Sequence, residues 1–142
     1  MSPLEAGSVA PDVPGMPAEG DRAVVFYKVT CPTCQMAAPA MERLSAALGD
    51  RFHAVVQDPP DRNEAFAHTY ATSFDAVTDD PPYPLSDAYG VRVVPSVFVL
   101  RDGEVRDVVE SWDRDGWNRA ASLLGAGELS HEGDGLPPFR PG

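Results

Sequence analysis

The sequence predicts one α/β domain in which a mixed β-sheet is flanked by helices. Two short apolar runs rich in β-branched and aromatic residues, 23–27 and 52–57, lie on either side of a helical pattern. Strands joined through a helix in this way pair in parallel by a right-handed crossover. A second pair of strand patterns, 96–100 and 104–110, is separated by a turn containing Asp-Gly, which is typical of an antiparallel hairpin. The two kinds of pairing together predict a mixed sheet.

The first elements run from an irregular lead-in to the first helix. Residues 1–22 are expected to form the lead-in, because residues 11–20 alone contain three prolines and two glycines. The strand at 23–27 then leads to the motif Cys-Pro-Thr-Cys at 31–34. Beyond it, apolar residues recur at three- and four-residue spacing as far as Leu48, which predicts a helix that starts at this motif.

The rest of the chain completes one domain. At 142 residues the chain can bury a core without disulfide crosslinks, and the domain is expected to span residues 23–125 with an insertion at about 58–85. Asp61 is predicted to cap a helix in the insertion, and Asp113 to cap the last helix. Residues 126–142 are rich in Gly, Glu, Ser and Pro, so we expect a flexible tail.

The two cysteines are the strongest chemical signal. Cys31 falls at a helix N-terminus, where free backbone N–H groups and the helix dipole favour a thiolate. Cys34 follows one helical turn later, close enough to close a small disulfide ring. This spacing predicts a redox dithiol in which Cys31 attacks a substrate disulfide and Cys34 resolves the intermediate.

A bare C-x-x-C is also found in zinc sites and as inert core thiols. The chain has only these two cysteines, whereas a closed zinc site needs four ligands. The other usual donors, His53, His68 and His131, do not form a ligand-spaced cluster with them. The redox interpretation is therefore favoured, and we expect no bound metal and no cofactor.

Charge and hydropathy limit the partners. The formal net charge is −11, from 11 basic and 22 acidic residues, which argues against nucleic acid or an anionic membrane surface as a partner. The sequence shows no secretory signal and no membrane-spanning stretch, so we expect a cytoplasmic monomer. In a reducing compartment a transient catalytic disulfide is the expected use of two thiols.

The order of motifs resembles the thioredoxin superfamily. A strand is followed by C-P-x-C, a proline stands at Pro39 in the helix, and Val94-Pro95 opens a later strand. The segment 7–12, Gly-Ser-Val-Ala-Pro-Asp, and Tyr-Gly-Val at 89–91 are similar to the TlpA-like or redoxin-type branch of thiol-disulfide oxidoreductases. The resemblance covers roughly residues 7 to 125 and implies a thioredoxin-like fold.

The resemblance also implies a substrate site and partners. It places Pro95 in cis against the dithiol and makes Val94, Pro95, Pro32 and Thr33 the substrate-binding residues. The implied substrate is a disulfide-containing protein or a low-molecular-weight thiol compound, and the implied electron source is a reductase or a thiol. The function expected is that of a thiol-disulfide oxidoreductase in cellular redox homeostasis.

Departures from the family keep two other functions open. Val25 and Thr30 stand where thioredoxins have a buried acid and an aromatic residue, so the proton acceptor of Cys34 is not identified. A peroxiredoxin-like thiol peroxidase is one alternative, although Lys28 stands where the threonine of a peroxidatic site is expected. A non-catalytic thioredoxin-fold module that binds a soft metal ion or a protein partner is the other.

Overall fold

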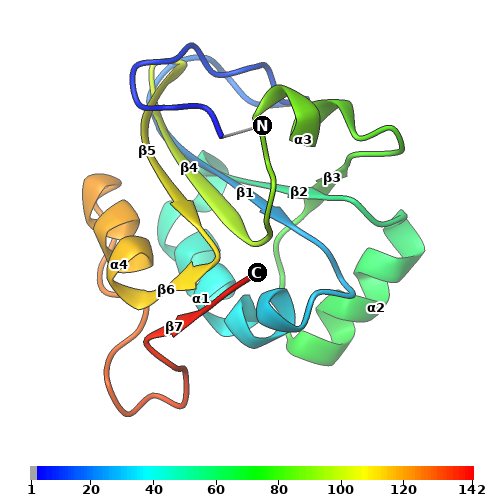
Figure 1. Cartoon of the computed structure of the whole chain (residues 1–142), viewed down its shortest axis with the longest axis vertical. Helices are drawn as coiled ribbons and strands as arrows, with labels where there is room; N and C mark the ends of the chain where they lie inside the picture. The colour runs from blue at the N-terminus through cyan, green and yellow to red at the C-terminus, as the bar shows by residue number, and fades with distance from the viewer. Residues whose placement is uncertain (1–2) are drawn as a thin grey trace.

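The computed structural model describes residues 3–142 and has a five-stranded mixed β-sheet at its centre (Figure 1). The strand order is β3-β2-β1-β4-β5. The central strand β1 (Asp21–Tyr27) pairs in parallel with β2 (Phe52–Val56), which pairs in parallel with β3 (Ala76–Thr78). On its other side β1 pairs antiparallel with β4 (Ser96–Arg101), which forms the hairpin with β5 (Glu104–Glu110). The predicted mixed sheet and thioredoxin-like architecture are confirmed.

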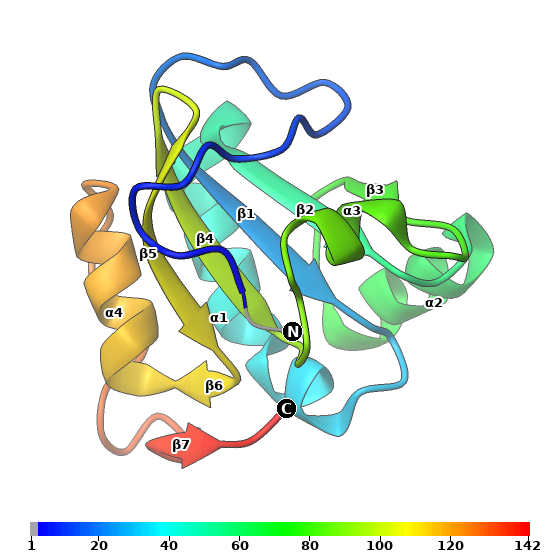
Figure 2. The same cartoon turned by 45° about the horizontal axis from the view of Figure 1, so that its top comes forward.

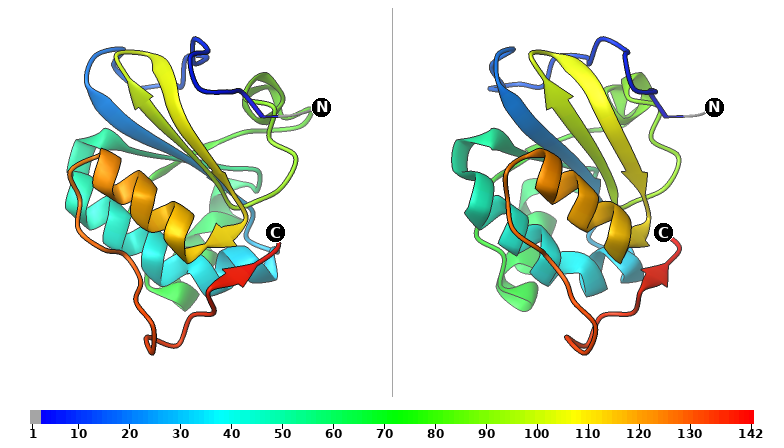
Figure 3. Two further views of the ribbon diagram at one scale, coloured as in Figure 1. Left: turned by 60° about the vertical axis from the view of Figure 1, so that its left-hand side comes forward. Right: turned by 90° about the vertical axis from the view of Figure 1, so that its left-hand side faces the viewer.

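Helices and the lead-in cover opposite faces of the sheet. Helices α1 (Pro32–Leu48), α2 (Pro60–Tyr70) and α4 (Arg114–Leu123) pack on one face, and the short turn η1 (Gly49–Arg51) follows α1 (Figure 3). Helix α3 (Pro84–Ala88) and the lead-in lie over the other face (Figure 2). Both faces of the sheet are therefore buried.

The side chains of the central strand β1 alternate between the two faces of the sheet and are buried on both. Its side chains are all apolar from Ala23 to Tyr27, and every one is at most 1% exposed. Val25 and its odd-numbered neighbours belong to the core beneath the helices, whereas Val24 and Phe26 belong to the core beneath the lead-in. A strand that is buried on both faces has a continuous run of apolar residues, as β1 does.

The described part of the predicted lead-in packs on the domain, but β1 begins at Asp21, inside the predicted range of 1–22, and residues 1–2 lie outside the described residues. Ala10 and Val13 are buried in the second core, and Val9 forms an isolated bridge with Glu104. Within residues 3–142, none of the helices combines the length and the apolar character that a membrane crossing requires.

One predicted helix cap is wrong, and the other has the predicted position but no capping hydrogen bond. The helix in the insertion begins at Pro60, before Asp61, and no side chain caps it. A proline fits the first helical position because it has no N–H group to satisfy there. Asp113 stands at the N-cap position of α4 without a capping hydrogen bond, and the N–H of Arg114 donates instead to the carbonyl of Pro138, 3.0 Å away.

Residues 126–142, for which the sequence predicts flexibility, lie along the domain in the structure (Figure 3). Leu129 is 3% exposed and belongs to the main core. Its backbone N–H donates to Asn118 Oδ1 (2.8 Å), and its carbonyl accepts from Arg43 Nη1 (2.7 Å). The composition is that of a loop, but these specific contacts attach the segment to α1 and α4.

Candidate active site

The two cysteines lie at the N-terminus of α1, where β1 delivers the chain. Cys31 is the N-cap residue in an extended conformation, and Pro32 occupies the first helical position. The Cys31 sulfur accepts a hydrogen bond from the backbone N–H of Cys34 at 3.2 Å. A thiol in the N-cap position thus takes the place that a serine or aspartate side chain commonly has.

The two thiols differ in exposure. Cys31 is partly exposed, whereas Cys34 is completely buried against the main core. A molecule in solution can therefore reach the Cys31 sulfur but not the Cys34 sulfur. This is the asymmetry that the sequence predicts for an attacking and a resolving thiol.

The electrostatics reinforce the asymmetry. A hydrogen bond from the Cys34 side chain, followed by bonds from the backbone N–H groups of Cys34 and Thr33, lowers the pKa of Cys31 to about 6. The positive charge of Arg140 lowers the same pKa further. Burial raises the pKa of Cys34 far above its ordinary range, and so does its hydrogen bond to Cys31. Near neutral pH the pair thus has one thiolate, on Cys31, and one proton, on Cys34.

The loop before β4 meets the dithiol. The Val94–Pro95 peptide bond is cis, as the family resemblance implies. The Cys31 sulfur lies 3.5 Å from the carbonyl oxygen of Val94, within hydrogen-bonding distance of a sulfur atom. Pro95 is buried, and its carbonyl accepts from the N–H of Ser111 at 2.8 Å. The structure thus brings Cys31, Cys34 and Val94 together.

The remaining predicted site residues have different surroundings. Pro32, next to Cys31 in the chain, is exposed to solvent. Thr33 is 3% exposed, and its hydroxyl donates to the carbonyl of Pro141 at 2.6 Å. Its polar group is therefore engaged by the end of the chain.

Asp58 is an acid at the site that sequence reasoning missed. It follows β2, and its Oδ2 accepts from the backbone N–H of Val29 at 2.8 Å, in the loop that leads to the dithiol. Its negative charge contributes to the raised pKa of Cys34. The sequence contained a signal for it: Asp58 follows β2, the dithiol follows β1, and the carboxyl ends of these parallel strands meet at one edge of the sheet.

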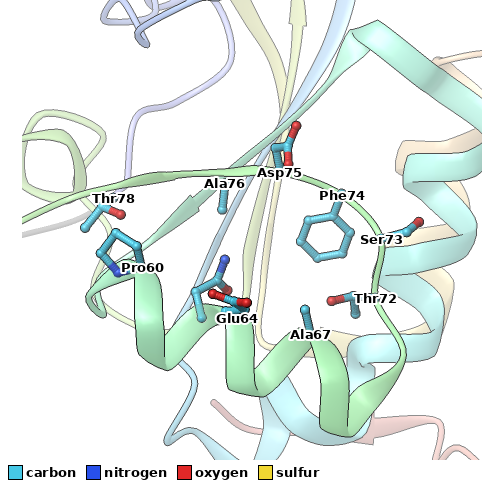
Figure 4. Close-up of a pocket in the computed structure, with 10 residues that line it drawn as sticks. Pro60, Glu64, Ala67, Thr72, Ser73, Phe74, Asp75, Ala76 and Thr78 are labelled. Atoms are coloured by element: carbon cyan, nitrogen blue, oxygen red, sulfur yellow. The ribbon is translucent and has the colours of Figure 1, made fainter.

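Two cavities differ in their relation to the dithiol. The larger, about 480 Å³, lies between α2 and the segment leading into β3, and neither cysteine lines it (Figure 4). Glu64 and Asp75 are its charged lining residues. A smaller cavity of about 250 Å³ lies beside the site, with Lys28, Val94 and Gly142 in its wall. Within residues 3–142, no group of three or more His, Cys, Asp or Glu side chains is placed to share a metal ion.

An N-capping thiolate, a buried partner thiol and a facing cis-proline on this sheet define a protein of the thioredoxin superfamily. The model of the AhpC/TSA family matches residues 16–108, and the chain belongs to this family. Among curated proteins, it is 28% identical to a thioredoxin of Rhodospirillum rubrum over 105 residues, 74% of this chain and 80% of that protein. It is 29% identical to a thioredoxin of Bacillus subtilis over 80 residues, which are 56% and 58% of the two chains.

Solved structures agree on the fold. A putative thiol:disulfide interchange protein DsbE from Chlorobium tepidum superposes with a TM-score of 0.71 at 22% identity, covering 89% of this chain and 99% of that one. The thioredoxin domain of a thiol-disulfide oxidoreductase from Bacteroides vulgatus gives 0.67 at 18% identity, covering 85% and 99%. These likenesses show that the fold is shared.

Proposed function

We propose that this protein is a thiol-disulfide oxidoreductase that uses Cys31 and Cys34 as its redox pair. The observation that carries the proposal is the asymmetry of the pair: a partly exposed, N-capping Cys31 sulfur lies 3.2 Å from the Cys34 N–H, and Cys34 is fully buried. The low pKa of Cys31 supplies the nucleophile near neutral pH.

The reaction proceeds in two exchanges. The Cys31 thiolate attacks one sulfur of the substrate disulfide, which forms a mixed disulfide and releases the other sulfur as a thiolate. Cys34 then loses its proton and attacks the Cys31 sulfur, which forms the Cys31–Cys34 disulfide and releases the second substrate thiol. The substrate gains two electrons and the protein loses two, and a reductase or a small thiol returns them.

Asp58 is the group that we propose to accept the Cys34 proton. It is the acid whose charge acts on Cys34, and its bond from Val29 N–H holds it in the loop beside the dithiol. It takes over the task that a buried acid at position 25 would have, where this chain has Val25. In the proposed cycle Asp58 takes the proton when the mixed disulfide is resolved.

We further propose that the protein acts on polypeptide or low-molecular-weight disulfides in the cytoplasm. Val94 supports the polypeptide part of this proposal, because its carbonyl lies beside the Cys31 sulfur on the loop that enters β4. An extended substrate can pair with such a backbone group while its disulfide lies over the thiolate.

The proposal is tested by trapping the intermediate. The Cys34→Ser variant, incubated with an insulin-type polypeptide disulfide, should accumulate a mixed disulfide at Cys31 that mass spectrometry detects. The Cys31→Ser variant is the matched control and should form none. The wild-type protein should catalyse reduction of the polypeptide by dithiothreitol, and both variants should lose that activity.

The same samples separate the alternatives. Consumption of hydrogen peroxide without disulfide reduction would replace the proposal with a thiol peroxidase. A stoichiometric copper or zinc content in the purified protein, with neither activity, would replace it with a metal-binding module. An adduct that forms on Cys34 in the Cys31→Ser variant as fast as on Cys31 would contradict the assignment of the nucleophile.

A further inference from the structure

The last residues of the chain run along the edge of the active site. Strand β7 (Phe139–Arg140) pairs antiparallel with β6 (Trp112–Asp113), which follows β5 directly (Figure 2). We call residues 137–142 the strap. At its start, the carbonyl of Pro137 accepts a hydrogen bond from Trp112 Nε1 at 2.7 Å. The strap is therefore an added strand on an otherwise free edge.

The end of the strap reaches the substrate-facing groups. The carbonyl of Pro141 accepts from Thr33 Oγ1 at 2.6 Å, and the N–H of Gly142 donates to Ser111 Oγ at 3.0 Å. Gly142 lies so close to Val94 that an added Cβ would overlap the Val94 carbonyl oxygen and come within 2.9 Å of its carbonyl carbon. That carbonyl oxygen is the one 3.5 Å from the Cys31 sulfur.

The chain before the strap is anchored firmly. Asp134 has a side chain only 5% exposed, which accepts from Ser130 Oγ (2.6 Å) and from the backbone N–H of Leu136 (2.9 Å). It also pairs with Arg114 at 3.6 Å. This anchored turn keeps the strap close to the dithiol, so the effective concentration of the strap at the edge of the site is high.

The strap is held by its backbone. Phe139 is 57% exposed and Arg140 is exposed, while the strap's carbonyls and N–H groups make the hydrogen bonds described above. Main-chain hydrogen bonds of an added strand accept many sequences, because specificity comes from side-chain pockets. Another extended polypeptide can therefore make the same bonds in place of the strap.

We propose that the strap is a built-in competitor for the polypeptide-docking edge formed by Ser111, Trp112, Thr33 and Val94, so that a polypeptide disulfide reacts only after displacing it. The proposal rests on the proposed function and deepens it, since it assigns the docking edge and a preference by size. Small disulfides need no added strand. Cys31 is partly exposed with the strap in place, and a cavity of about 250 Å³ is lined in part by Val94 and Gly142.

The test compares the accessibility of Cys31 to small and large thiol reagents. The proteins are the full chain, a chain that ends at Leu136, the Gly142→Ala variant, and Gly127→Ala as a control whose added Cβ meets nothing within 4 Å. Each is alkylated with iodoacetamide and with a maleimide carrying a polyethylene glycol chain. The ratio of the two rates is the readout, because any change in Cys31 ionisation, including the loss of the Arg140 charge, cancels in it.

We expect the shortened chain to raise the ratio of large-reagent to small-reagent rates at least about fivefold, since several backbone hydrogen bonds no longer close the edge. Gly142→Ala should raise it in the same direction by a smaller factor, and Gly127→Ala should leave it unchanged. Reduction of an insulin-type polypeptide should accelerate in parallel, whereas reduction of hydroxyethyl disulfide should not. A synthetic peptide with the sequence of residues 136–142 should slow the polypeptide reaction of the shortened chain.

Equal ratios in the full chain and in Gly142→Ala, with no inhibition by the peptide, would overturn the proposal. Circular dichroism would show whether the shortened chain unfolds. In that case the rate ratio of the Gly142→Ala variant, and the inhibition of this variant by the peptide, decide the outcome. Alkylation needs no turnover, so a strap that shields Cys31 in a protein without reductase activity would refute the proposed function and leave the shielding established.

Discussion

The hydrogen bond from the Cys34 side chain to the Cys31 sulfur is the largest single reason for the low pKa of Cys31, so removing it should raise that pKa. Cys34→Ala deletes the donor and keeps the backbone N–H groups of α1. A hydrogen bond to a charged group contributes about 1.5–3 kcal/mol, and 1.36 kcal/mol shifts a pKa by one. Because Cys31 is partly exposed, solvent screens the interaction, and we take the lower end of this range. The expected pKa rises from about 6 to about 7.

The assay is the rate of iodoacetamide alkylation as a function of pH. Wild-type Cys31 is unreactive when protonated and should reach half of its maximal rate at pH about 6. The Cys34→Ala variant should reach it near pH 7 by the same reasoning. The midpoint is the readout, because the intrinsic reactivity of a thiolate also rises with its pKa. Thermal unfolding at each pH verifies that both proteins are folded.

The matched control is Cys34→Ser, whose hydroxyl can still donate to the thiolate. Its midpoint should stay within about 0.5 of the wild-type value, because the charge-assisted bond is preserved. A Cys34→Ala midpoint that remains near 6 would show that the backbone N–H groups of α1 and the charge of Arg140 set the pKa by themselves. Equal upward shifts in the Ala and Ser variants would point to altered packing around Cys31.

Three further predictions concern stability and proton transfer. Trp117→Ala should lower the free energy of unfolding in urea by about 3–5 kcal/mol, because this side chain is fully buried, whereas Leu123→Ala, at a site 46% exposed, should cost about 0.5 kcal/mol or less. In a protein that keeps Cys34, Asp58→Asn should lengthen the life of the transient mixed disulfide about tenfold or more without moving the alkylation midpoint, because Cys34 loses its proton acceptor; an unchanged lifetime would exclude Asp58. Hydrogen bonds, first that from Ser130, lower the pKa of Asp134 to about 2, so its stabilising effect is complete above about pH 4 and is lost as the pH falls toward 2. The thermal midpoint should therefore fall less between pH 5 and pH 2 in Asp134→Asn than in the wild type, and equal decreases would contradict this.

The sequence by itself determined the elements whose causes are local. The apolar run from Ala23 to Tyr27, rich in β-branched and aromatic residues, predicts a buried strand, and β1 is buried at the centre of the sheet. Pro32 directly after Cys31 predicts a helix start, and Cys31 is the N-cap of α1. Asp102 and Gly103 both have positive φ in the hairpin turn, as the dipeptide predicts. In each case, neighbours in the chain supply the interaction.

The family resemblance supplied what those local patterns do not contain. Nothing in the residues around Val94-Pro95 predicts a cis bond, since such bonds are rare among X-Pro pairs. The position of this pair ahead of an apolar strand resembled the family's, and the bond is cis in the structure.

Only the tertiary structure decided what lies around the dithiol. Asp58 is 24 positions after Cys34 in the sequence, and the parallel pairing of β1 with β2 brings its charge to that thiol. The strap has the composition of a free tail, yet side chains of Thr33, Ser111 and Trp112 form hydrogen bonds with its backbone. Contacts between residues far apart in the chain depend on how the domain has already folded, so no local pattern records them.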